Sequence, residues 1–549
     1  RPDWEACVVD RAASMVERDK NHPAILWWSC GNESYAGTGI LAMSQYYHKK
    51  DPSRVVHYEG VSWNREYDQI SDVESRMYAT PDMVREYFET DGKKPYLLCE
   101  YMHDMGNSIG GMESYIRLLD EFPGYQGGFI WDYADQAIYH KNHRGEEVLG
   151  YGGDFLDRVT DYAFSGNGIV FADRTEKPAM QDVRHWYAPK AQREAFEAAQ
   201  QEKREAAQKR LAEEMAALDV KNASAEKGLS AVHGDANYGV RGDGFEIIFS
   251  VTEGGPVSIV YNGTEYLYRA PKPALWRAST ENDKGNSFRA KSSVWMAADA
   301  FSLCTGCEVT EYAKSFAANT GDTKKEAAGA DEGCAAEKCT ARKYDIQDAA
   351  HRAPAAADLE KVSLMYTYEF PAAPGAKAEI TYTVDRAGRI HTEVVYHGAK
   401  GLPELPEFGL RLLIPGKAES YTWEGLSGET YPDRKKGGTF GVHTGTPEAA
   451  HYLVPQECGN HADTCQAQIG DLRIVMDGEP FHLSVLPYTP EELENATHRD
   501  ELPDTGRTVV SILGRMRGVG GIDSWGSDVE PPYRIPADQD IKYAFYLMK

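Results

Sequence analysis

Residues 96–101 read YLLCEY, a short apolar run that ends in a glutamate and a tyrosine. Further apolar runs lie on either side of it, at Ala24–Cys30, Val55–Tyr58, Ile70–Tyr78 and Gly128–Trp131. Amphipathic stretches separate these runs. Nearly continuous apolar strands that alternate with helices are typical of a parallel sheet covered on both faces. Residues 1–188 are therefore predicted to form an α/β unit, for which a βα barrel and a doubly wound sheet both remain open.

Residues 189–230 differ abruptly in composition, because residues 190–219 consist almost entirely of Ala, Glu, Lys, Gln and Arg, the strongest helix formers. The large apolar residues of 190–219 are few: Phe196, Leu211, Met215 and Leu218. So thin an apolar stripe predicts a solvated helix that links two domains. A coiled coil that binds a partner is the alternative.

Residues 231–549 show the period-two pattern of β-strands. In VSLMYTYEF, for example, Val362, Leu364 and Tyr366 alternate with more polar residues. Strict alternation with glycine-containing turns predicts a large antiparallel β-sandwich with one buried face per strand. The Ala-rich, weakly patterned stretch Ala317–Leu359 is expected to be a mobile insertion.

Composition excludes several classes of protein. The chain has 549 residues and a net charge of −26, so it repels phosphate backbones and is not expected to bind nucleic acid. No apolar run approaches the roughly 18 residues of a membrane span. Nine cysteines in so long a chain do not form a disulfide framework, which favours a reducing, cytoplasmic compartment.

Two cysteine pairs admit a zinc site as a minor alternative. Cys304 and Cys307 form one pair, and Cys334 and Cys339 form the other. Together they could offer four thiolates, but the segment between them is polar and weakly patterned and no histidine pattern accompanies it.

Two glutamates stand where the chemistry is expected. Glu33 follows the first predicted strand, and Glu100 ends the fourth. Because the carboxyl ends of parallel barrel strands share one rim, both carboxylates are expected there, as glycoside hydrolysis requires. Helix capping by the surrounding Asn and Ser residues is the competing explanation. It does not account for Tyr101, His103 and Trp131, which are expected at the same rim, where aromatic and hydrogen-bonding side chains suit a sugar pocket.

Several longer motifs carry a family resemblance: WSCGNES (28–34), CEYMHDMGNS (99–108), GGFIWDYADQ (127–136), YGGDF (151–155), NGIVFADR (167–174), WRASTENDKGN (276–286), GLSGETYPDR (425–434) and GIDSW (521–525). In this order they resemble the bacterial β-galactosidases of glycoside hydrolase family 2. The resemblance implies a retaining enzyme that removes terminal non-reducing β-D-galactose from β-galactosides such as lactose by double displacement. A non-catalytic complementing subunit or a carbohydrate-binding fragment is the alternative.

The resemblance also implies roles for individual residues. Glu100 resembles the nucleophile, and Glu33 resembles the acid/base and a magnesium ligand, with their carboxyl groups about 5–5.5 Å apart. The remaining matches are expected to bind galactose, its aglycone or sodium: Asn32 at the 2-hydroxyl, Tyr78 beside the nucleophile, His103 at other hydroxyls, Trp131 as the floor, Trp525 on the aglycone side, and Phe164 and Asn167 as sodium ligands.

The same resemblance sets the expected architecture. The family's acid/base ends barrel strand four and its nucleophile ends strand seven, an interval of three that matches the strand count here. We therefore expect a partial TIM (β/α)8 barrel of strands 4–8 in residues 1–188, a charged helical linker in 189–230 and a large β-sandwich in 231–549. The remaining magnesium and sodium ligands are expected outside this sequence. Completion by another polypeptide, or assembly into a homo-oligomer, is expected as well.

Overall fold

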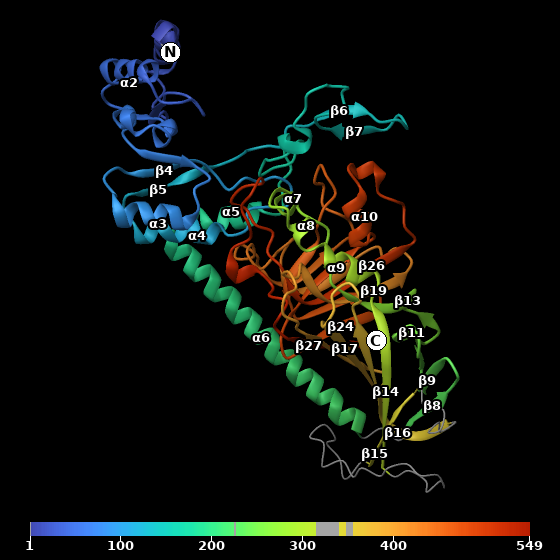
Figure 1. Cartoon of the computed structure of the whole chain (residues 1–549). Coiled ribbons are helices and arrows are strands. Elements are labelled where there is room, and N and C mark those ends of the chain that lie inside the picture. Colours follow the sequence, from blue (N-terminus) through green and yellow to red (C-terminus); the bar gives the residue numbers. More distant parts are fainter. Residues whose placement is uncertain (1, 224–226, 315–339, 347–354) are drawn as a thin grey trace.

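The structure is a computed structural model that describes residues 2–223, 227–314, 340–346 and 355–549 (Figure 1). An α/β part runs from the 3₁₀ helix η1 (Pro2–Trp4) to the helix α5 (Met180–Trp186), and a β-rich part begins at strand β8 (Leu229–His233). The long helix α6 (Lys190–Ala223) connects the two parts.

Five strands of the α/β part are paired in parallel, as the apolar runs predict. These strands are β1 (Trp27–Ser29), β2 (Val55–His57), β3 (Glu74–Met77), β4 (Tyr96–Tyr101) and β5 (Tyr125–Ile130). Strand β1 pairs with β2, and β3, β4 and β5 form a second sheet in that order. The other elements of the α/β part are α1 (Glu5–Asp19), α2 (Thr38–Lys50), α3 (Pro81–Thr90), α4 (Met112–Glu121), η2 (Glu59–Ser62), η3 (Arg65–Ile70), η4 (Tyr162–Ser165) and the antiparallel hairpin β6 (Ile138–Lys141) to β7 (Glu147–Gly150).

Asp72 joins the two parallel sheets. Its backbone N–H donates to the Val56 carbonyl at 2.9 Å, and its carboxylate accepts the Val56 N–H at 2.7 Å. A side chain thus satisfies a backbone donor that a neighbouring strand would otherwise bind. The prediction of one strand over Ile70–Tyr78 is therefore wrong in its first half, where η3 extends to Ile70 and only Glu74–Met77 is a strand.

The β-rich part consists of two packed antiparallel sheets. Among the described residues, fifteen strands form the larger sheet and five form the smaller one, in the order β13-β19-β26-β25-β22. Side chains of both sheets, such as Val394 and Phe545 from the larger and Leu410 and Ile512 from the smaller, belong to one buried cluster. The predicted sandwich and its alternation are confirmed on β16, where Val362, Leu364 and Tyr366 are buried.

The remaining bounds are as follows. The strands are β9 (Asn237–Gly242), β10 (Phe245–Ser250), β11 (Gly255–Tyr261), β12 (Thr264–Glu265), β13 (Arg269–Ala274), β14 (Leu303–Ala313), β15 (Thr340–Asp345), β16 (Ala355–Glu369), β17 (Lys377–Asp385), β18 (Ile390–His397), β19 (Glu407–Pro415), β20 (Tyr421–Leu426), β21 (Phe440–Gly445), β22 (Asn460–Thr464), β23 (Gln466–Ile469), β24 (Leu472–Asp477), β25 (Phe481–Leu486), β26 (Arg507–Met516) and β27 (Ile541–Met548). The helices are α7 (Glu281–Gly285), α8 (Phe288–Lys291), α9 (Ser293–Ala300), α10 (Pro490–Asn495), η6 (Arg499–Glu501) and η7 (Pro531–Tyr533). Of the expected insertion at Ala317–Leu359, strand β15 and the start of β16 are described, and most of the rest lies outside the described residues.

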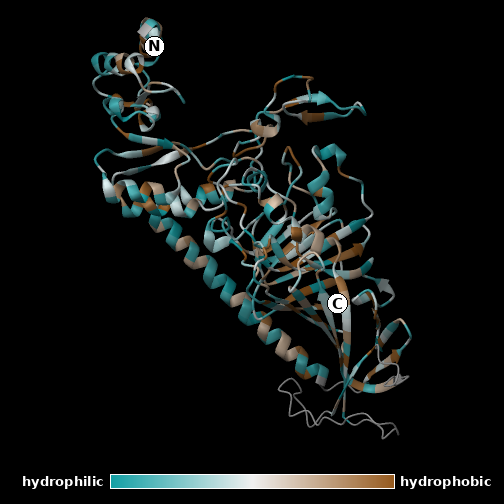
Figure 2. Cartoon of the chain, in the orientation of Figure 1, coloured by the Kyte–Doolittle hydropathy of each residue, from teal (hydrophilic) through white to brown (hydrophobic). Residues whose placement is uncertain are grey.

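Helix α6 lies along the sandwich and is not solvated on all sides. Ala207, Leu211 and Met215 are buried and belong to the same cluster as the sandwich core. Its charged residues bind partners on the strands: Arg204 contacts Asp463 at 2.8 Å, for example. The prediction of a solvated linker is therefore wrong for this face, although the rest of the helix is hydrophilic (Figure 2). Within the described residues, no helix combines the length and the apolar character that crossing a bilayer requires.

Candidate active site

Glu100 and Tyr78 face each other at the carboxyl ends of β4 and β3. The Tyr78 hydroxyl donates to Glu100 Oε2 at 2.9 Å, and the Tyr78 backbone N–H donates to the Glu100 carbonyl, also at 2.9 Å. Burial raises the pKa of Glu100, and the charges of Glu33 and Glu59 raise it further, while the Tyr78 hydrogen bond lowers it. Burial and the charge of Glu100 raise the pKa of Tyr78. The phenol therefore stays protonated and keeps donating to the carboxylate.

Glu33 and Asn32 lie on the loop after β1, and both are exposed. The Glu33 backbone N–H donates to Oε1 of the buried Glu59 at 2.7 Å. The charge of Glu33 contributes to the raised pKa of Glu100. Glu33 follows the carboxyl end of β1 and Glu100 lies at the carboxyl end of β4, so each predicted carboxylate lies at the end of a parallel strand.

Three non-glycine residues at these strand ends adopt a left-handed backbone conformation. Their φ angles are 51° at Glu33, 51° at Tyr78 and 53° at Met102. Such conformations cost on the order of 1–3 kcal/mol each and persist where the surrounding structure enforces them. Their concentration at one rim is typical of a functional site.

His103 is buried within a group of aromatic rings. Its ring centroid lies 5.1 Å from that of Trp525 and 5.5 Å from that of Phe164, and Tyr78 lies 4.6 Å from Trp525. Burial lowers the pKa of His103 to about 4, so the imidazole is neutral. The structure therefore brings Tyr78, His103, Phe164 and Trp525 together, and Tyr78 links this group to Glu100.

Trp131 lies directly after β5 and is 40% exposed. Its backbone N–H donates to the Tyr101 carbonyl at 3.1 Å, and its backbone carbonyl accepts the Asp104 N–H at 2.9 Å. A cis peptide bond joins Trp131 to Asp132. Trp131 thus lies at the same strand ends as Glu100. Within the described residues its ring has no contact with the aromatic group around His103.

Phe164 and Asn167, the two residues predicted to bind sodium, contact each other. Asn167 Nδ2 donates to the Phe164 carbonyl at 2.8 Å and lies 3.4 Å from His103 Nε2. Asn167 Oδ1 is buried and has no hydrogen-bond partner among the described residues. An unpaired buried oxygen beside a backbone carbonyl fits a cation with oxygen ligands.

The fit to magnesium is poorer. Glu33 offers one exposed carboxylate, and in the described part of the chain it belongs to no group of three histidine, cysteine or carboxylate side chains. The one such group found there is His57, Glu59 and Cys99. These residues therefore supply at most part of a magnesium site.

The segment after Glu100 is held by the sandwich. His103 Nδ1 lies 2.8 Å from Ser524 Oγ, and Ser524 Oγ in turn donates to Asn282 Oδ1 at 2.8 Å. The Asn107 N–H donates to Gln456 Oε1 at 3.0 Å. The sequence prediction missed Ser524, Asn282, Gln456 and Glu59, although the first two lie within quoted motifs. The motifs that contain Ser524 and Asn282 were recognisable in the sequence, but nothing in them indicated which residues these two side chains contact.

Asp104 follows His103 and is completely buried. Neither of its carboxylate oxygens has a hydrogen-bond partner among the described residues. Burial raises its pKa to about 7, against the opposing charges of Lys177 and Arg434. This carboxyl group is therefore largely protonated below neutral pH.

Half of the alternative zinc site lies outside the described residues. Cys304 and Cys307 lie on β14 as free thiols, whereas Cys334 and Cys339 are not among the residues that the structure describes.

Comparisons with known proteins agree with the motifs. Residues 1–191 match the family model "Glycosyl hydrolases family 2, TIM barrel domain", and residues 241–547 match "Beta galactosidase small chain". A β-galactosidase of Halalkalibacterium halodurans is 36% identical over 99% of this chain and 57% of its own length. The chain thus spans a little over half the length of such curated relatives.

Two relatives are separate subunits. The β-galactosidase small subunit of Latilactobacillus sakei is 40% identical over 59% of this chain and 98% of its own length. The β-galactosidase large subunit of Leuconostoc lactis is 59% identical over 34% of this chain and 30% of its own length. With both family models matched along its length, the chain belongs to the β-galactosidases of glycosyl hydrolase family 2.

Proposed function

We propose that this chain carries both catalytic carboxylates of a retaining β-galactosidase, with Glu100 as nucleophile and Glu33 as acid/base. The hydrogen bond from Tyr78 to Glu100 Oε2 is the observation that carries the proposal. It orients a half-buried carboxylate at the end of a parallel strand, where barrel enzymes place their reacting groups. The electrostatic influence of Glu33 on Glu100 supports the pairing of the two residues.

The reaction proceeds in two displacements. Glu100 attacks the anomeric carbon while the bond to the leaving oxygen breaks, and Glu33 gives its proton to that oxygen. Glu33, now a carboxylate, takes a proton from water as the water oxygen attacks the same carbon and releases Glu100. Tyr78 holds one oxygen of Glu100, which leaves the other to form the galactosyl ester.

The sugar is bound by the surrounding side chains. Trp131 presents an exposed ring on which the apolar face of galactose can lie, and the neutral His103 can exchange hydrogen bonds with its hydroxyls. Asn32 is exposed next to Glu33 and suits the 2-hydroxyl. Trp525, half-exposed beside Tyr78, covers the aglycone side. Lactose is the natural candidate among such β-galactosides.

We propose sodium and magnesium as cofactors, and the described residues fit sodium better than magnesium. Asn167 Oδ1 and the Phe164 carbonyl would hold sodium and so fix the loop beside His103. Magnesium would use Glu33 together with ligands from elsewhere, and it would supply positive charge next to the acid/base. Neither displacement depends on a metal-bound species.

We further propose that another polypeptide segment completes a barrel whose strands 4–8 are β1 to β5. The relatives of greater length and the separate large and small subunits support this. Apolar side chains exposed on the α/β part suit such an interface: Tyr133, Ile138, Tyr139, Leu156 and Val159. We also propose that the completed protein assembles into a homo-oligomer.

Covalent labelling tests the assignment. The chain, alone and with the completing polypeptide, is incubated with a 2-deoxy-2-fluoro-galactosyl fluoride and digested for mass spectrometry. Glu100 is the expected labelled residue, and Glu100→Gln is expected to remove both label and hydrolysis of a nitrophenyl galactoside. A label on another residue, or hydrolysis retained in Glu100→Gln, contradicts the proposal.

A complementing role without activity of its own is the second candidate. Coverage of 98% of a small subunit favours it, because much of this chain then corresponds to a polypeptide that acts with a partner. The same experiment separates the two: activity and label that appear only after the completing polypeptide is added indicate complementation.

A further inference from the structure

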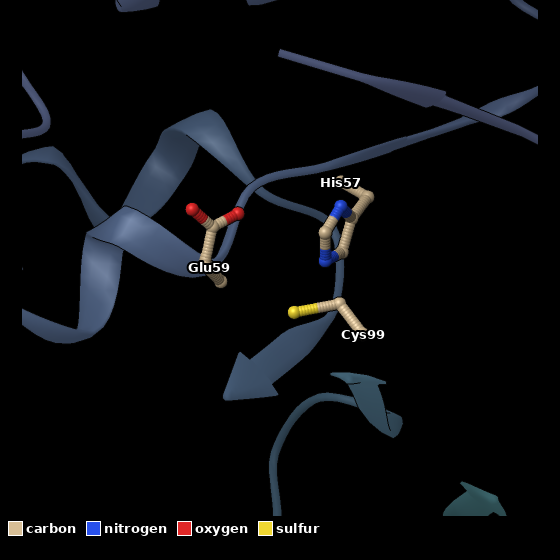
Figure 3. A group of neighbouring side chains, drawn as sticks. All are labelled: His57, Glu59 and Cys99. Carbon is tan, nitrogen blue, oxygen red and sulfur yellow. The ribbon is translucent and has the colours of Figure 1, made fainter. Parts of the chain in front are cut away.

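Three potential metal ligands of different chemistry meet beside the rim (Figure 3). They are His57 at the end of β2, Glu59 in η2 and Cys99 in β4, so the tertiary fold brings them together. One ligand atom from each lies within 4.8 Å of the others. The Cys99 sulfur extends toward the space between the Glu59 carboxylate and the His57 ring.

A fourth donor stands beside the group. Ser75 Oγ lies 2.7 Å from His57 Nε2, and the Ser75 hydroxyl also bonds to Cys99. Ser75, His57 and Glu59 are all buried, with exposed fractions of 0%, 7% and 2%. Cys99 is half-buried. An imidazole, a thiol, a carboxylate and a hydroxyl therefore share one small space in which three of the four residues are buried.

This donor set is selective. Nitrogen and sulfur ligands favour a borderline-soft cation such as zinc, whereas magnesium prefers oxygen ligands only. Neighbouring ligands of a tetrahedral zinc stand about 3.3–3.6 Å apart, given metal–ligand bonds of about 2.0–2.3 Å. Side-chain rotations that close the widest separation by little more than about 1 Å suffice to reach that geometry.

We propose that His57, Glu59 and Cys99, with Ser75 beside them, form a binding site for a zinc-type divalent cation. The site is distinct from the magnesium expected at Glu33 and does not depend on the proposed function. A bound cation balances the charge of the buried Glu59 and ties β2, η2 and β4 together. Because Glu59 also accepts the Glu33 N–H, occupancy fixes the loop that carries Glu33.

Cobalt substitution tests the site without any assay of activity. The full chain is stripped with a chelator and titrated with Co²⁺. One equivalent is expected to produce thiolate-to-cobalt charge-transfer absorption in the near ultraviolet and the intense visible bands of tetrahedral cobalt. Zn²⁺ is expected to abolish both signals, and equimolar Mg²⁺ is expected to leave them unchanged.

Variants assign the ligands. Cys99→Ser is expected to lose the charge-transfer band, and His57→Gln is expected to keep the thiol but weaken Co²⁺ binding at least about tenfold. Cys30→Ser is the matched control, because Cys30 is a buried thiol of the same α/β part that lies outside the group. Circular dichroism of each metal-free variant reports whether it folds.

Three results would overturn the proposal: no cobalt–thiolate band in the wild type, a band that survives in Cys99→Ser, or one that disappears equally in Cys30→Ser. If Cys99→Ser does not fold, the decision rests on His57→Gln, whose unchanged affinity would also overturn it.

Discussion

The carboxylate of Glu59 accepts the backbone N–H of Glu33 at 2.7 Å, and Glu33 has a φ of 51°. Non-glycine residues seldom adopt this conformation unless a neighbour enforces it. The orientation of the proposed acid/base therefore depends on the buried carboxylate of a residue in η2, which follows the next strand, β2.

Replacing Glu59 should impair proton donation more than nucleophilic attack. In Glu59→Leu the Glu33 loop loses its acceptor, and kcat for aryl galactosides with poor leaving groups should fall about 10²-fold. Dinitrophenyl galactoside, which needs little acid assistance, should be affected much less. Glu59→Gln keeps an acceptor oxygen and should lose far less. Equal losses for both leaving groups would show that Glu59 does not act through Glu33.

Tyr78→Phe should slow the attack by Glu100 and shift its titration. Loss of a hydrogen bond to a charged group costs about 1.5–3 kcal/mol, or roughly 10–150-fold in kcat/KM. Because the Tyr78 bond lowers the pKa of Glu100, its removal raises that pKa. Glu100 then stays protonated to a higher pH, and the acidic limb of the profile of kcat/KM against pH should shift to higher pH. An unshifted limb would contradict this assignment.

Ser524→Ala should weaken substrate binding through His103. The change removes the 2.8 Å contact with His103 Nδ1 and the donor to Asn282. A hydrogen bond of about 1 kcal/mol corresponds to roughly a fivefold rise in KM, with a smaller change in kcat. The exposed Ser293→Ala serves as control in the same steady-state assay. A fall in kcat at constant KM would argue against a role in positioning His103.

Asp104→Asn should change how stability depends on pH. The pKa of Asp104 is about 7 in the folded chain, so between about pH 4 and 7 the folded state holds a proton that the unfolded state has released. This contribution to stability is therefore lost as pH rises, by about 1.4 kcal/mol per pH unit. Urea unfolding should show the variant close to the wild type at about pH 4 and more stable at about pH 8. A constant difference would refute the raised pKa.

Leu211→Ala should loosen α6 from the sandwich. Leu211 is 1% exposed, and truncating such a side chain costs about 2–5 kcal/mol. Lys209→Ala, two residues earlier on the exposed face, should change stability by no more than about 0.5 kcal/mol. Urea unfolding followed by circular dichroism compares the two. Similar midpoints would mean that the helix is not held by its buried face.

The strands could be predicted because their apolar patterns report burial directly. Runs such as YLLCEY and the alternation around Tyr366 were sufficient for the parallel and the antiparallel sheets. Contacts between distant segments left no such trace: His103 and Ser524 meet across 421 residues. The buried face of α6 was missed because it uses a small residue, Ala207, and because its ion pairs involve the remote sandwich. Family membership is confirmed, while the roles of Glu33 and Glu100 remain predictions.

The packing of one face of α6 against the sandwich restricts how the length of this helix can vary. Its 34 residues span about 51 Å, and each residue turns the helix by about 100°. A single insertion before Ala207 would rotate Leu211 and Met215 away from the strands and carry the charged side chains onto them. The linker helices of homologues should therefore differ in length by near-integral numbers of turns, such as about 7 or 11 residues, because only these changes keep the same face against the strands.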